Sequence, residues 1–305
     1  MADKQKKWDG RSRGGRTGYL IFAFILKHLG LGFAYCLLAF VVPYFMVFAP
    51  SQTSASWHYQ RRRLHRGRLR SLAGLYSHYF NFGQALIDKM AMAAGAAERF
   101  SFEYDNYDKA LEIVGRHEGA IFIGAHIGNW EVASHFFGEY GKDISVVMYQ
   151  NENRDIKELL EQMYGTLPFK PIAINLDPLG AMIEIKAALN AGGYVCFDGD
   201  RYVDRNSAVE RDFMGGKVLI PEGPYRIASK CRVPVIFFFA MREKRRKYRF
   251  IFEELPAVDC SKAGNIIDAY LLSLGDKIAR YPMQWFNFYD FWEDGKTAKS
   301  GKLIV

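Results

Sequence analysis

The chain has 305 residues, of which 50% are hydrophobic and 15% aromatic, and its formal net charge is +8. That length allows one large hydrophobic core or two small ones. The positive charge favours an anionic partner, such as nucleic acid, an anionic membrane surface, or an acidic carrier or substrate. The cysteines are widely spaced and form no C-x-x-C pair, which argues against a zinc site and a disulfide framework and favours reduced, cytosol-facing thiols. They are Cys36, Cys196, Cys231 and Cys260.

The N-terminal fifty residues combine a basic segment with a long apolar run. Residues 1–18 are polar and basic, and no cleavage site of small residues follows, so we do not interpret them as a secretory signal peptide. Residues 29–49 contain no charge and are long enough to span a bilayer. A buried helix or one lying in the membrane plane is the alternative. Basic residues flank both ends, so the positive-inside rule does not orient the segment.

A basic cluster, RRRLHRGRLR, follows at residues 61–70. Its position beside an apolar segment favours contact with anionic lipid head groups. Nucleic-acid binding is the competing interpretation, but the neighbouring hydrophobic segment argues against it. The apolar residues of 72–92 recur at roughly helical spacing and predict an amphipathic helix that packs on the core.

Strands alternate with helices through the rest of the chain. Apolar runs predict strands at 100–104, 120–124, 144–149, 171–175, 194–197, 233–240 and 248–253, the last with the alternation of an antiparallel strand. Helices are predicted at 107–116, 131–140, 156–164, 179–190, 225–230 and 266–280. This order predicts an α/β fold with a mostly parallel central sheet flanked by helices, preceded by an N-terminal membrane helix. We expect two parts, an anchoring segment at 1–50 and a catalytic domain at 51–305.

The segment GAIFIGAHIGNWEVASHFFG, residues 119–138, organises the predicted site. His126 directly follows the buried strand 120–124, and Glu131 comes five residues later. Ligands of open α/β sheets bind beyond the carboxyl ends of the strands. An imidazole paired with a carboxylate in that place could make a hydroxyl or amine nucleophilic, because the carboxylate orients the ring and the imidazole takes the proton. A structural histidine is the alternative interpretation.

Two further polar clusters follow predicted strands. Arg154 lies just past the strand 144–149, where a cation could meet an anionic substrate group. A solvated arginine at a helix start is an equally good interpretation. Asp198, Asp200 and Arg201 end the strand 194–197, where they could order the site or form a structural ion-pair cluster.

These residues also carry a family resemblance. The segment H-I-G-N-W-E, from His126 to Glu131, resembles the lysophospholipid acyltransferase superfamily, and most closely its late acyltransferases of lipid A biosynthesis, the lauroyl and myristoyl transferases. Supporting motifs come in the expected order: Asn153-Arg154, Asp198, F-M-G-G at 213–216, P-E-G-P at 221–224 and P-M-Q-W at 282–285. The chain departs from the family where Asp198-Gly199 replaces an Asp-Gln pair and where P-M-Q-W is followed by F-N-F-Y. These departures leave the mechanism intact and the acceptor open.

The resemblance implies acyl transfer from an acyl thioester, carried by acyl carrier protein, to a hydroxyl of a lipid A precursor or related glycolipid. It implies His126 and Glu131 as the catalytic pair, no cofactor or metal, and a place on the cytoplasmic face of a bacterial inner membrane. The residues expected to bind substrate are Asn129, Trp130, Arg154, Asp198, Asp200, Arg201, Gly215, Pro221 and Gly223. An amino-acid lipid or lysophospholipid acceptor, and a membrane-surface binding protein without catalysis, are the alternatives.

Overall fold

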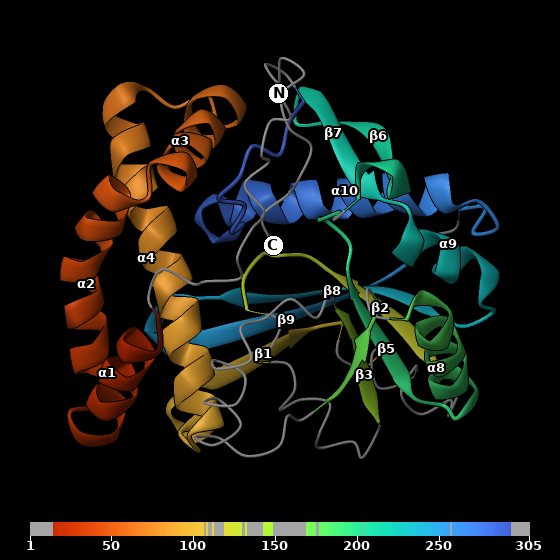
Figure 1. Cartoon of the computed structure of the whole chain (residues 1–305), viewed down its shortest axis with the longest axis horizontal. Coiled ribbons are helices and arrows are strands. Elements are labelled where there is room, and N and C mark those ends of the chain that lie inside the picture. Colours follow the sequence, from red (N-terminus) through yellow and green to blue (C-terminus); the bar gives the residue numbers. More distant parts are fainter. Residues whose placement is uncertain are drawn as a thin grey trace, which may run out of the picture.

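The computed structural model describes residues 15–106, 108, 112, 119–129, 132, 143–148, 169–174, 177–202, 204–256 and 258–293. Its N-terminal part is a helical arm packed against one side of an α/β domain (Figure 1). The arm consists of α1 (Gly15–His28), α2 (Gly30–Phe48), α3 (Pro50–His58) and a short π-helical turn, Tyr59–Arg63. Helix α4 (Arg68–Ala93) then lies between α2 and the sheet.

Seven of the described strands form the central sheet, in the order β1-β9-β8-β2-β5-β3-β4. They are β1 (Ser101–Asp105), β2 (Ala120–Gly124), β3 (Ile144–Met148), β4 (Lys170–Ala173), β5 (Tyr194–Asp198), β8 (Val235–Arg242) and β9 (Lys247–Glu254). Neighbouring strands are parallel except for β8 and β9. The strands β6 (Ala208–Phe213) and β7 (Gly216–Pro221) form a separate antiparallel hairpin. Helices α8 (Pro178–Asn190), α9 (Gly223–Lys230) and α10 (Ala263–Arg280) complete the domain.

Strand β2 lies at the centre of the sheet, and all five of its residues are buried. Alternate side chains of a strand point to opposite faces, so this strand contributes to two cores. Ile121 and Ile123 join the core beneath α8, α9 and α10, whereas Phe122 joins the core shared with α2 and α4. The parallel register places Gly124 opposite Asp198 of β5. The carboxyl ends of these two strands therefore lie side by side. The polar residues His126 and Asp198 were predicted to follow or end these strands.

The predicted α/β class with a mostly parallel sheet is confirmed, as is the antiparallel strand at 248–253. Sequence reasoning missed α3 and the hairpin of β6 and β7, where the F-M-G-G and P-E-G-P motifs were read without strands. The apolar run is divided into α1 and α2 at Leu29. The predicted helices at 131–140 and 156–164, and all of 107–116 except residues 108 and 112, lie outside the described residues.

A buried polar cluster joins the helical arm to the sheet. Asp88 of α4 has 0% exposure and accepts hydrogen bonds from Tyr35 of α2, from Arg242 Nε at 2.7 Å and from the Tyr248 hydroxyl at 2.6 Å. The arginine and the two tyrosines come from three different elements, α2, β8 and β9. The Asp88 carboxylate thus accepts a hydrogen bond from each of these three side chains and joins the three elements.

We expect Asp88→Ala to lower the free energy of unfolding by about 3–5 kcal/mol, because it leaves the Arg242 cation and two buried hydroxyls without their acceptor. Urea unfolding followed by circular dichroism measures the change. Asp268→Ala is the matched control, because Asp268 pairs with Arg211 at 2.8 Å but is 60% exposed. That exposed pair contributes below about 1 kcal/mol. Equal losses in the two variants would contradict the structural role of Asp88.

Candidate active site

His126 lies just past the end of β2, in a loop held in place by its backbone. The amide of Phe286 donates to the His126 carbonyl at 2.7 Å, and the Gly128 amide donates to the Gln284 carbonyl at 2.8 Å. Gly128 has φ +67° and approaches Ala240 so closely that a Cβ atom would lie 2.1 Å from its carbonyl oxygen. Only glycine accommodates both conditions. The loop is therefore fixed between β8 and the P-M-Q-W segment near the C-terminus.

Two carboxylates from the end of β5 meet the His126 ring, one at each nitrogen. Asp200 Oδ1 lies 2.7 Å from Nδ1, and Asp198 Oδ2 lies 3.7 Å from Nε2. The His126 backbone amide also donates to Asp200, at 3.1 Å. The His126 side chain is 24% exposed and that of Asp198 33%, whereas the Asp200 side chain is fully buried. The ring is therefore anchored at Nδ1 by a buried carboxylate, whereas the carboxylate near Nε2 is partly exposed.

The charge state of Asp200 determines which ring nitrogen carries the proton. Burial alone would raise the pKa of Asp200, but His126, Arg201 and the Trp285 indole outweigh it and lower that pKa to about 2. An ionised carboxylate only accepts hydrogen bonds, so the His126 Nδ1 must be the donor. In the neutral imidazole the lone pair is then on Nε2, the nitrogen nearer to the partly exposed Asp198. The Trp285 Nε1–H donates to Asp200 at 3.2 Å and fixes the carboxylate itself.

Two buried tyrosines hold the strand ends that carry these groups. The Tyr225 hydroxyl of α9 donates to the Gly199 carbonyl, and the Tyr270 hydroxyl of α10 donates to the Gly124 carbonyl, both at 2.9 Å. A Cβ atom at Gly199 would lie 2.5 Å from the Tyr225 hydroxyl and 2.7 Å from Ile123. Glycine between the two aspartates thus lets α9 and α10 pack directly against the site.

A second histidine supports the Trp285 segment from behind. His78 of α4 is fully buried; its Nε2 donates to the Trp285 carbonyl at 2.7 Å, so its Nδ1 accepts from the Ser56 hydroxyl, also at 2.7 Å. Burial lowers the pKa of His78 from 6.5 to about 4, although the bond to Trp285 opposes the shift. His78 is therefore neutral at physiological pH.

We expect the stability of the protein to fall as the pH falls from 6.5 towards 4. In this window the unfolded chain takes up a proton at His78 and the folded chain does not, so acid favours unfolding, by up to about 3 kcal/mol. His78→Gln keeps a donor for the Trp285 carbonyl and does not titrate, so its stability should depend less on pH. Urea unfolding at several pH values compares the two proteins. Identical pH dependence would show that His78 is not neutral in the folded state.

Asn129 and Arg201, two residues expected to bind substrate, make contacts within the protein. Asn129 is buried, and its side-chain amide donates to the Ala85 carbonyl at 2.9 Å. Arg201 donates through Nη2 to the Phe286 carbonyl at 2.8 Å and through Nε to the Asn287 side chain at 3.2 Å. Both side chains thus hold neighbouring segments against the site.

Gly215, Pro221 and Gly223 lie in the hairpin and at the start of α9. Gly215 belongs to the turn between β6 and β7, and its carbonyl accepts a bond from Arg63 at 2.9 Å. Pro221 ends β7, and Gly223 begins α9, the helix that carries Tyr225. Trp130, Glu131 and Arg154 lie outside the described residues. The sequence-predicted residues that the structure brings together at the imidazole are therefore Asp198 and Asp200.

The residues missed by sequence reasoning are Trp285 as a partner of Asp200, the two tyrosines Tyr225 and Tyr270, and His78. P-M-Q-W was recognised as a motif, but no pattern relates its indole to a carboxylate 85 positions earlier. Among the described residues, no three His, Cys, Asp or Glu side chains are placed so that they could hold a metal ion.

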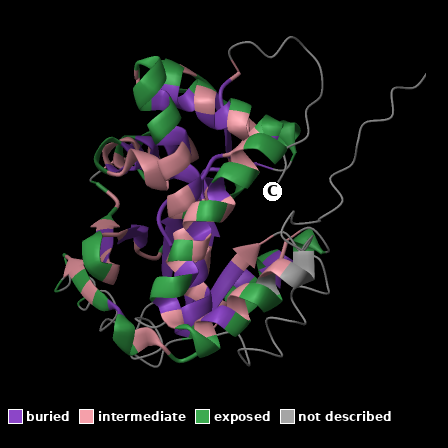
Figure 2. Ribbon diagram, turned by 90° about the vertical axis from the view of Figure 1, so that its left-hand side faces the viewer, coloured by how far each residue is buried: buried purple, intermediate pink, exposed green. Residues whose placement is uncertain are grey.

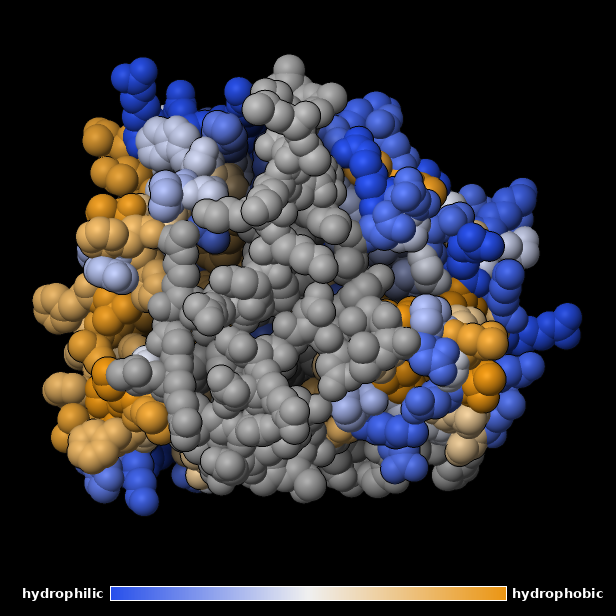
Figure 3. All heavy atoms as spheres, in the orientation of Figure 1, coloured by the Kyte–Doolittle hydropathy of each residue, from blue (hydrophilic) through white to orange (hydrophobic). Residues whose placement is uncertain are grey.

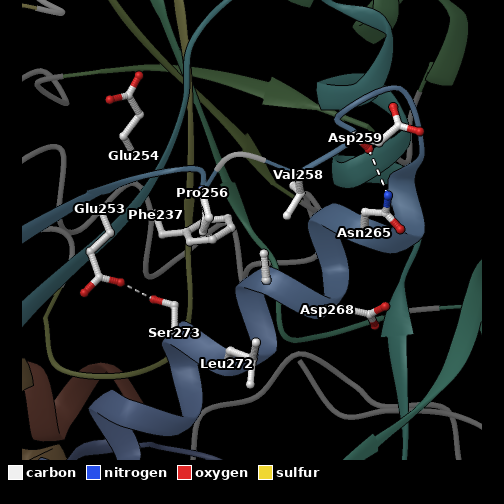
Figure 4. Close-up of a pocket in the computed structure, with 11 residues that line it drawn as sticks. Phe237, Glu253, Glu254, Pro256, Val258, Asp259, Asn265, Asp268, Leu272 and Ser273 are labelled. Atoms are coloured by element: carbon white, nitrogen blue, oxygen red, sulfur yellow. Dashed lines mark hydrogen bonds between the residues drawn. The ribbon is translucent and has the colours of Figure 1, made fainter.

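A pocket of about 580 Å³ lies elsewhere, between α10 and the end of β9 (Figure 4). Phe237, Pro256 and Leu272 supply apolar walls, and Glu253, which bonds Ser273, lies at one side. The Leu255 amide bonds the Val235 carbonyl, so this end of β9 adjoins the start of β8. Because β8 is parallel to β2, the start of β8 and the pocket beside it lie at the amino-terminal ends of these strands. His126 follows the carboxyl end of β2, so the pocket is at the opposite end of the strands.

An imidazole placed as His126 is can act as a general base. One ring nitrogen donates to a buried carboxylate, the other carries the lone pair of the neutral ring, and a second carboxylate lies near it and could stabilise a charged ring. A family model described as bacterial lipid A biosynthesis acyltransferase matches residues 78–294, which is more than half of the chain. No curated protein matches the chain.

Proposed function

The chain belongs to the bacterial lipid A biosynthesis acyltransferase family, and on that basis we propose that it transfers a fatty acyl chain from an acyl carrier protein thioester to a hydroxyl of a lipid A precursor. Within that family we assign it to the lauroyl and myristoyl transferase branch, acting at the cytoplasmic face of the inner membrane. The observation that carries the proposal is the His126 ring with one carboxylate at each nitrogen, at the carboxyl end of a central parallel strand.

In the proposed reaction His126 Nε2 removes the proton of the acceptor hydroxyl as the oxygen attacks the thioester carbonyl. Asp200 stabilises the imidazolium through Nδ1, and Asp198, 3.7 Å from Nε2, adds a second negative charge. The tetrahedral intermediate then collapses, the C–S bond breaks, and the proton passes from His126 to the departing thiolate. No acyl-enzyme is needed.

Glu131 remains a proposed catalytic residue. Its expected role was to orient the His126 ring, but Asp200 already bonds Nδ1 of that ring. We propose that Glu131 acts on the loop or on the acceptor. Because Nε and Nη2 of Arg201 are bonded to Asn287 and Phe286, we propose Arg154 as the arginine that stabilises the oxyanion. Asn129 is proposed to act by fixing the loop, and Trp130, Gly215, Pro221 and Gly223 by shaping the acceptor site.

The test is to incubate the purified protein with an acyl donor and a lipid acceptor and to weigh the products by mass spectrometry. Acyl carrier protein thioesters and acyl-coenzyme A are compared as donors. The acceptors are a lipid A precursor, a lysophospholipid and an amino-acid lipid. The proposal expects a lipid A precursor heavier by one acyl chain, formed from the carrier protein thioester and absent with His126→Ala. If only another acceptor is acylated, the assignment to lipid A is wrong. If none of the donor and acceptor pairs gives an acylated product, the proposal that the protein is an acyltransferase is wrong.

A further inference from the structure

The inner face of α2 is part of the folded domain along most of the helix. Leu31, Ala34, Leu38 and Val42 recur every three to four residues and are all buried. Leu38 packs against Gly83 of α4, where a Cβ atom would lie 2.4 Å from the leucine. Such a close approach of two helices requires glycine at the contact. Helix α2 is therefore packed lengthwise on α4 (Figure 1).

Polar contacts hold α2 in the same place. The Tyr76 hydroxyl of α4 donates to the Ala39 carbonyl of α2 at 3.1 Å. Tyr35 reaches the buried Asp88, which also binds Arg242 of the central sheet. The opposite side of α4 carries His78, which bonds the Trp285 carbonyl beside the site. Helix α4 is thus the layer between α2 and the sheet.

The outer face of α2 is a continuous apolar stripe. Phe33, Phe40 and Val47 are spaced by seven residues, lie on one side of the helix and are more than half exposed, Phe40 to 80%. Tyr44 and Phe48 extend the stripe, and Leu20, Ile21 and Phe24 of α1 continue it. The stripe covers the left side of the molecule in Figure 3, and Figure 2 shows exposed positions alternating with buried ones along this side. A patch of this size marks an interaction surface.

Cations flank the stripe at both ends. Lys27 lies in the last turn of α1. At the other end Arg62, Arg68 and Arg70 are exposed beside Leu69, which is 86% exposed, and Leu72. Not all of the basic cluster is available, because Arg63 bonds the Gly215 carbonyl and lies over the Trp292 ring. Exposed arginines beside exposed leucines fit the boundary between anionic head groups and acyl chains.

We propose that α2 lies along the membrane surface, with its stripe among the acyl chains of one leaflet, and that it does not cross the bilayer. A crossing helix would have to take α4, with buried Asp88 and His78, and the attached sheet into the hydrocarbon core, which excludes such groups. In the plane, the cations at both ends reach head groups of the same leaflet. This inference rests on the proposed function only in taking a bilayer as the partner.

The test measures the depth of three points on the stripe. Single cysteines replace Phe33, Phe40 and Val47 in a background where the accessible native cysteines are serine, and each carries an environment-sensitive fluorophore. The proteins are bound to vesicles of phosphatidylethanolamine and phosphatidylglycerol that contain quenchers at shallow or deep acyl positions. A fourth protein keeps Cys260, which is exposed in the loop before α10, as the control outside the stripe.

We expect equal, shallow quenching at all three stripe positions and none at Cys260. A crossing helix would instead place Phe40 deepest and the other two near opposite surfaces, about 21 Å apart, because each residue rises ~1.5 Å. That result would overturn the proposal, and so would the absence of quenching at all three positions. The depths do not depend on acyl transfer, so this test fails or succeeds separately from the proposed function.

A second variant tests whether the stripe drives binding. Phe40→Glu places a charge at the most exposed apolar position of the stripe, where it touches the packed face least. We expect vesicle binding in flotation to fall by at least tenfold while the thermal midpoint stays unchanged. Ile183→Glu, at an exposed apolar position of α8, is the control for the same change of charge away from the stripe. Undiminished binding of Phe40→Glu would contradict the proposal.

Discussion

His126→Ala is expected to lower the rate of acyl transfer by about 10²–10⁴-fold, the contribution of a well-placed general base. In the proposed reaction the imidazole takes the proton at Nε2 and later gives it to the leaving thiolate, so the substitution removes both the base and the later proton donor. Single-turnover measurements with a saturating acyl donor separate this loss from product release. Because the side chain is partly exposed, the fold should survive, which circular dichroism and the thermal midpoint check.

A His126→Ala protein with more than a tenth of the wild-type rate would contradict the base role. His58→Ala is the matched control, because His58 is an exposed histidine at the end of α3. It should transfer acyl chains at the wild-type rate. A similar loss in both variants would mean that the assay reports folding or membrane binding and not proton transfer.

Asp200→Asn has the second largest expected effect, a fall in kcat of about 10²–10³-fold with little change in KM. The amide has the same size and still accepts from Trp285, but it carries no charge to stabilise the imidazolium, and its NH2 group can turn the ring to the wrong tautomer. The loss should appear in kcat because Asp200 is buried and touches His126, not the substrate. Initial rates over a range of acceptor concentrations separate the two constants.

Glu131→Gln and Asp198→Asn, measured in the same assay, show how much each of the three carboxylates contributes to kcat. We expect Asp200→Asn to have the largest effect of the three, because Asp200 makes the 2.7 Å bond to Nδ1. If Glu131→Gln lowers kcat by 10²-fold or more and Asp200→Asn has no effect, Glu131 orients the ring and the role of Asp200 is wrong.

What could be predicted from the sequence depended on how local the signal was. The strand at 120–124 and the position of His126 were predicted because an apolar run between glycines, followed by a polar residue, is a pattern of neighbours in the chain. The aspartates were placed correctly at a strand end for the same reason. Their meeting with His126 depends on the pairing of Gly124 with Asp198, which only the register of β2 and β5 determines.

Patterns among neighbouring residues did not indicate the more distant parts of the structure, such as Trp285 and the hairpin. Trp285 reaches Asp200 because Ile127 and Trp285 form a backbone bridge, and the sequence around either residue contains no sign of it. The hairpin of β6 and β7 was missed because its strands carry Glu210, Arg211 and Asp212 in succession, which weakens the alternation expected of a half-buried strand. The proposal that α2 lies in the membrane plane rests on what α2 packs against, which hydropathy does not record.

The tautomer of His126 is the most direct test of the account. Nitrogen-15 NMR of the histidine rings, with the His126 signals assigned by their loss in His126→Ala, reports which nitrogen carries the proton at neutral pH. The proposed mechanism predicts a proton on Nδ1, donated to Asp200, and a lone pair on Nε2. A neutral ring with its proton on Nε2 would leave no lone pair facing the acceptor and would contradict the proposed mechanism.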